Sequence, residues 1–138
     1  MGFKKFDTLI SSKMPVDYWE DDQLFAAQEI AESFTDDDWS QVSSTLPTKN
    51  SEWRIRLLQS ICECKDSADA IAVILDCLDD SDGQVVEYAV DSLRGYVGSE
   101  QLISIRLNED QVKKIEGLVD KDGVVAKVAS DLLSKIKN

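Results

Sequence analysis

The sequence has 138 residues, of which 43% are hydrophobic, and 15 Lys and Arg residues stand against 27 Asp and Glu residues. This length fits one domain, and the apolar fraction is too high for a disordered chain. The net charge of −12 disfavours nucleic acid and anionic membrane surfaces as partners and favours a basic protein. Histidine is absent, which removes the commonest general base and metal ligand, so we expect no enzyme and no cofactor.

The composition also predicts a cytoplasmic protein. No apolar run approaches the ~20 residues that span a bilayer, and no apolar region of a signal peptide follows the N-terminus. The odd number of cysteines, Cys62, Cys64 and Cys77, predicts free thiols. Cys64 is next to Lys65, which could lower the thiol pKa, but no histidine could serve as its base.

Helical periodicity dominates the chain, and we predict seven helices after a short N-terminal capping segment, residues 1–19. The first helix covers about 20–34, with an apolar stripe formed by Leu24, Ala27, Ile30, Ala31 and Phe34. Thr35 caps the second helix, with Asp38 in place of the Glu of a capping box, and this helix ends before Pro47.

The other five helices follow at short intervals. Ser51 caps the third, whose predicted inner face is Trp53, Leu57, Leu58 and Ile61. The fourth begins near Asp66 or Ser67, and the fifth spans about 83–96 and ends at Gly98. The sixth covers 102–119 as one helix or two, and the seventh covers about 123–137.

An internal repeat underlies these helices. Residues 78–86 align with 118–126 at an offset of 40, and the match continues through Ala89 with Ala129 and Leu93 with Leu133. An earlier copy, at an offset of 32, places Leu46, Trp53, Leu57 and Ile61 at the positions of Leu78, Val85, Ala89 and Leu93. A period of roughly 30–45 residues with two helices per unit predicts an α-solenoid.

The repeated pattern resembles the HEAT repeat: an Asp-x-Asp turn, a Val, and then Ala and Leu four and eight residues further on. The resemblance implies an all-α, HEAT-like α–α superhelix, a right-handed solenoid that forms a single domain over residues 1–138. Most HEAT units place an Arg after the Val, where this chain has Val86 and Ala126, and only Arg54 matches.

The two turns at 80–83 and 120–123 contain the core of a calcium-binding loop. An EF-hand would need its first Asp at Leu78 or Leu118 and its bidentate Glu at Ala89 or Ala129. Both copies fail at both positions. We therefore predict that the acids of these turns cap the helices that follow them.

The acidic residues are concentrated in one part of the chain, which predicts an acidic partner-binding surface. Residues 17–82 hold 17 acids and four bases, whereas residues 83–138 hold nine acids and eight bases. On the repeat geometry, one edge of the solenoid gathers Asp21, Asp22, Glu52, Asp79, Asp80 and Asp82. The opposite edge gathers Asp36, Asp37, Asp38, Asp66 and Asp69, and Trp39 is the candidate for an exposed aromatic anchor.

A narrower resemblance covers the first third of the chain. The stretches Lys4-Lys5-Phe6-Asp7, Met14 to Trp19 and Asp21 to Ala31 resemble small helical immunity proteins of bacterial contact-dependent growth inhibition and related polymorphic toxin systems. This resemblance implies a cytoplasmic antitoxin, monomeric when free, that binds the C-terminal toxin domain of one cognate protein in a 1:1 complex. The toxin is often an RNase, such as a tRNase, whose active site the antitoxin blocks.

Two other functions remain open from the sequence. One is a HEAT-like adaptor or assembly factor with several partners. The other is a scaffold for a small ligand, as in the HEAT-like phycobilin lyases.

Overall fold

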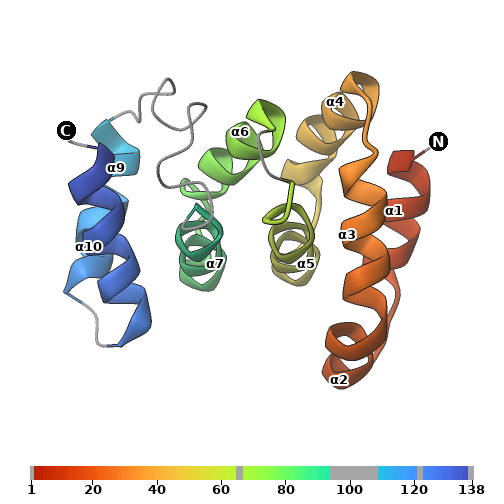
Figure 1. Cartoon of the computed structure of the whole chain (residues 1–138), viewed down its shortest axis with the longest axis horizontal. Coiled ribbons are helices and arrows are strands. Elements are labelled where there is room, and N and C mark those ends of the chain that lie inside the picture. The colour runs from red at the N-terminus through yellow and green to blue at the C-terminus, as the bar shows by residue number, and fades with distance from the viewer. Residues whose placement is uncertain (1, 65–66, 94–108, 121–122, 137–138) are drawn as a thin grey trace. The chain divides into compact units, whose positions relative to one another are not determined.

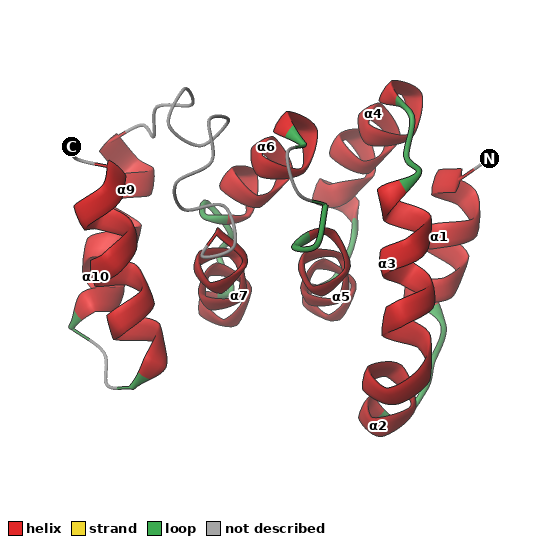
Figure 2. Cartoon of the chain, viewed as in Figure 1, coloured by secondary structure: helices red, strands yellow, loops and turns green. Residues whose placement is uncertain are grey.

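The computed structural model describes residues 2–64, 67–93, 109–120 and 123–136 of the chain. Within these ranges every regular element is a helix (Figure 2), which confirms the all-α class. The chain divides into two compact units, residues 1–64 and residues 65–138. Figure 1 shows the helices of each unit with the labels used below.

The first unit begins with a helix that the sequence pattern did not predict. Helix α1, Gly2–Ser11, occupies the expected capping segment and packs against α3, α4 and α5. It buries Phe3, Phe6 and Ile10, which recur at the helical spacing of three and four residues. The rings of Phe6 and Phe34 meet edge to face, with centroids 5.1 Å apart.

A continuous helical run follows and contains a π-helical turn. It consists of α2 (Val16–Tyr18), the π-helix η1 (Trp19–Gln23) and α3 (Leu24–Glu32). The backbone N–H of Leu24 donates to the carbonyl of Trp19, which is the i to i−5 bond that defines the π turn. The indole of Trp19 is buried, and its N–H donates to the Gln59 side chain at 2.8 Å.

Two further α-helices complete the first unit, and local caps explain where they begin. Helix α4 (Asp36–Thr45) starts with the predicted capping box of Thr35 and Asp38, and the 3₁₀ turn η2 (Leu46–Thr48) follows it. Helix α5 (Ser51–Ile61) is capped by Asn50, so the predicted Ser51 cap is wrong. The Asn50 side chain accepts a hydrogen bond from the backbone N–H of Trp53, which is the geometry that an N-cap requires.

The second unit consists of α6 (Ala68–Cys77), α7 (Gly83–Leu93), α9 (Glu109–Val119) and α10 (Val124–Ile136) among its described residues. Ser67 caps α6, so the helix begins close to the predicted start near Asp66 or Ser67. The Asp82 carboxylate accepts the backbone N–H of Gln84 at 2.9 Å, which confirms that this acid caps α7. The predicted extension of α7 to Tyr96 and Gly98, and the stretch 102–107, lie outside the described residues.

The burial pattern follows the internal repeat. Ala89 and Ala129 both have no exposed surface, and Leu78 and Leu118 are both buried. In each unit, helices separated by an intervening segment pack together: α3 contacts α5, and α7 contacts α10. This packing is compatible with the layers of an α-solenoid. Among the described helices, none has the length and apolar composition that crossing a bilayer would need.

Candidate partner-binding surface

The predicted aromatic anchor, Trp39, is buried and cannot contact a partner directly. Only 7% of its surface is exposed, and its ring meets Phe34 edge to face at a centroid distance of 5.1 Å. Phe34 in turn packs against Phe6 of α1. The unpredicted helix α1 therefore extends the aromatic cluster that covers Trp39.

Asp38 is also buried, so its predicted place among the partner-binding acids is wrong. Its carboxylate accepts the backbone N–H of Thr35 at 2.9 Å and the backbone N–H of Phe3 at 3.0 Å. The hydrogen bond from Thr35 lowers the pKa of Asp38, and together with the bond from Phe3 it outweighs burial, which raises the pKa. The carboxylate is thus held ionised between the N-terminal turns of α1 and α4.

Phe25 is the aromatic residue that the structure exposes in place of Trp39. Two thirds of its surface, 66%, is open to solvent, although it lies in the middle of a helical run. Asp21 and Asp22 lie one turn before it, Glu29 lies one turn after it, and all three acids are exposed. Residues three and four positions apart are neighbours on a helix surface. We call these four residues the Phe25 surface.

Other apolar side chains are exposed close to the Phe25 surface. Val16 is 66% exposed and Tyr18 is 48% exposed, both in the short helix α2. The Tyr18 hydroxyl accepts a hydrogen bond from the Gln23 side chain at 2.9 Å, a contact across the π turn. Helical stretches with π turns are common at functional sites.

The sequence carries a signal for the exposure of Phe25, although the predicted site did not include this residue. The predicted inner stripe of this helix includes Leu24, Ala27 and Ala31, and Ala27 and Ala31 are buried in the structure. At 100° per residue, Phe25 points to the opposite side of the helix from that stripe. A large aromatic residue on the polar side of a helix is therefore recognisable from the periodicity alone.

The other predicted acids of the first unit lie in α4 and α5. Asp36 and Asp37 are exposed at the start of α4, so they lie at the opposite end of α3 from Asp21 and Asp22 (Figure 1). Glu52 is exposed in the first turn of α5, where it forms an ion pair with Arg56 at 2.7 Å.

Three of the predicted acids of the second unit, Asp79, Asp80 and Asp82, have partners within that unit. Asp79 forms an ion pair with Lys114 at 3.6 Å, and Asp80 accepts the backbone N–H of Asp82 at 2.8 Å. Asp82 caps α7 as described above, and Asp69 is exposed in the first turn of α6. Asp66 lies outside the described residues.

The Cys64 thiol is buried. Burial raises the pKa of the Cys64 thiol to about 12, with the carboxylate of Glu32 acting in the same direction, so the suggestion of a lowered pKa is wrong. Such a thiol remains protonated at neutral pH and is a poor nucleophile. No group of three or more acidic or cysteine side chains is arranged to hold a metal ion among the described residues.

The chain matches no protein-family model, no curated protein and no solved structure.

Proposed function

We propose that this protein acts by binding a basic protein partner through the Phe25 surface. The observation that carries the proposal is the exposed phenyl ring of Phe25 with acids one helical turn away on either side. A large aromatic side chain can anchor an interface, and surrounding charges select a partner of opposite sign. Lys and Arg side chains can bind this surface in two ways, because they pair with carboxylates and also stack on aromatic rings.

We further propose that the partner is a toxin domain and that the protein is its HEAT-like cytoplasmic immunity protein. A nuclease active site is built to hold phosphates and therefore carries basic residues. A chain with a net charge of −12 is attracted to such a site, and electrostatic steering can raise the association rate constant towards 10⁸–10⁹ M⁻¹s⁻¹ at low salt. Binding alone would then block the toxin, without catalysis by the antitoxin.

The partner can be identified by purifying the tagged protein from its own cells at low and at moderate salt. We expect one stoichiometric partner that corresponds to the C-terminal part of a large exported protein. Several housekeeping proteins would instead favour a HEAT-like adaptor and would contradict the antitoxin proposal.

The role of the Phe25 surface is tested by charge reversal. Replacing both acids, Asp21→Lys and Asp22→Lys, should weaken partner binding at least about 100-fold, because two attractive contacts become repulsive. The matched control reverses Asp36 and Asp37, which changes the net charge equally at the other end of α3 and should lower the affinity much less. Isothermal titration calorimetry at 150 mM salt measures both variants.

The aromatic anchor has its own test. Phe25→Ala should weaken binding about 30-fold, as expected for a hot-spot residue, while the exposed position keeps the effect on folding small. Circular dichroism checks that helicity is unchanged. Equal affinities for the wild type and for Phe25→Ala would exclude this surface as the binding site.

A further inference from the structure

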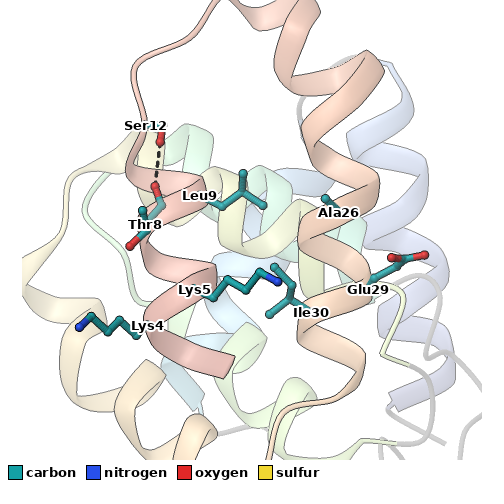
Figure 3. Close-up of a pocket in the computed structure, with 8 residues that line it drawn as sticks. All are labelled: Lys4, Lys5, Thr8, Leu9, Ser12, Ala26, Glu29 and Ile30. Atoms are coloured by element: carbon teal, nitrogen blue, oxygen red, sulfur yellow. Dashed lines mark hydrogen bonds between the residues drawn. The ribbon is translucent and has the colours of Figure 1, made fainter. Parts of the chain in front are cut away.

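A groove with a volume of about 700 Å³ runs between α1 and α3, and Glu29 is the one residue of the Phe25 surface that lines it (Figure 3). The α1 side contributes Lys4, Lys5, Thr8, Leu9 and Ser12, and the α3 side contributes Ala26, Glu29 and Ile30. Its volume lies within the range of small-molecule sites, roughly 300–1,000 Å³.

The groove is apolar in its middle and carries a positive charge at one end. Leu9 and Ala26 line its middle, whereas Lys5 extends across one end towards Ile30 (Figure 3). Lys4 and Glu29 also line the groove, but their charged ends point away from it in the same view. Lys5 forms no ion pair with any residue that the structure describes, although the chain has nearly twice as many acids as bases. An ammonium group without an ion-pair partner among the described residues therefore lies at one end of a mainly apolar groove.

The walls determine what kind of molecule this groove can hold. Both walls are α-helices, whose backbone N–H and C=O groups are paired within the helix. The groove consequently offers no edge with which the main chain of an extended peptide could pair. A hydrocarbon tail needs no such partners, and a negatively charged head group would complement Lys5. From Lys5 to Ser12 the wall is about 10 Å long at 1.5 Å per residue, which suits a tail of medium length.

We propose that the α1–α3 groove binds a free medium-chain fatty acid. The alkyl tail lies on Leu9, Ala26 and Ile30, and the carboxylate pairs with the ammonium group of Lys5. Decanoate has twelve heavy atoms, and at the ligand efficiency of ordinary small molecules its Kd would be on the order of 1 mM. This proposal does not rest on the proposed function, because the group that binds the carboxylate is Lys5 of α1, although Glu29 belongs both to the Phe25 surface and to the wall of the groove.

The test is a titration of the full-length, isotope-labelled protein with sodium decanoate, followed by amide chemical shifts. We expect saturable shifts confined to α1 and α3, with the soluble decyltrimethylammonium cation, which carries a tail of the same length and the opposite charge, binding the groove at least tenfold more weakly. Lys5→Glu should weaken decanoate binding at least tenfold. Lys13→Glu is the matched control, since it changes the net charge equally at an exposed lysine outside the groove and should leave the Kd within about twofold.

Three results would overturn the proposal: shifts that do not saturate, equal affinities for decanoate and decyltrimethylammonium, or equal Kd values for the two lysine variants. Saturable binding centred on another element would also exclude the groove. Because Lys5 is exposed, its replacement should leave the fold intact, and the spectrum of the free variant checks this directly.

Discussion

Asp38 lies where the first turns of two helices meet, and its carboxylate serves both. It completes the capping box of α4 through Thr35 and also accepts the backbone N–H of Phe3 in α1. The buried carboxylate thus satisfies donors that helix N-termini would otherwise leave without partners. The capping box is a local pattern and was predictable, whereas the second contact joins residues 35 positions apart and leaves no local signal in the sequence.

Replacing this carboxylate tests its double role. Asp38→Asn should lower the free energy of unfolding by about 2 kcal/mol, because the amide turns a donor towards backbone N–H groups. Asp36→Asn, an exposed change in the same helical turn, is the control and should cost less than about 0.5 kcal/mol. Urea unfolding at pH 7 measures both variants.

The pH dependence gives an independent check on Asp38. Its folded-state pKa is lowered below the ordinary value of 3.8, so its contribution is complete above that value and is lost as the pH falls through the folded-state pKa. The stability difference between the wild type and Asp38→Asn should therefore be constant above about pH 5 and shrink below 3.8. A difference that does not change with pH would show that the charge of Asp38 does not stabilise the fold.

Among the elements, α1 differs most from the prediction, and both of its ends are held by side chains from later helices. Asp38 holds its first turn, and Arg56 of α5 donates to the carbonyls of Ile10 at 3.0 Å and Ser12 at 2.8 Å. The buried guanidinium also lies over the ring of Trp19, 5.2 Å from its centroid. Arg56 therefore connects α5 with the C-terminal end of α1 and with η1.

Removing the Arg56 side chain should destabilise α1 more than the other helices. Arg56→Ala leaves two carbonyl groups without their donor and should cost about 3 kcal/mol. Its partner Glu52 is largely exposed, so no buried charge is left behind. Hydrogen exchange should accelerate in α1 more than in α6, and trypsin should cleave faster after Lys13. Equal acceleration in every helix would contradict a local role for Arg56.

The elements show which sequence signals were sufficient. The capping box of Thr35 and Asp38 and the Ser67 cap were predictable, because a cap depends on residues within one turn. The burial of Trp39 was not predictable, because it depends on an aromatic cluster completed by Phe6, more than 30 residues away. The exposure of Phe25 was predictable from helical geometry alone, because this residue lies on the side of the helix opposite the predicted apolar stripe.

At the scale of the whole molecule, charge is the property that composition determines most directly. A net charge of −12, with the acids concentrated in residues 17–82, imposes self-repulsion on the folded chain. The repeat predicted the helical class and the buried positions of Ala89 and Ala129. The repeat gave no information about Lys5, because this residue lines a groove only when α1 packs beside α3.

This self-repulsion predicts a pH-dependent response to salt. Raising NaCl from 20 to 500 mM at pH 7 should increase the Tm by about 5 °C, since added ions screen repulsion between exposed carboxylates. Near pH 4.3, the isoelectric point, the same addition should change the Tm much less, because the net charge is then close to zero. Asp38 remains ionised there because its pKa is lowered, so the capping interactions are not lost in the comparison. An equal response to salt at both pH values would mean that the concentrated acids do not destabilise the fold.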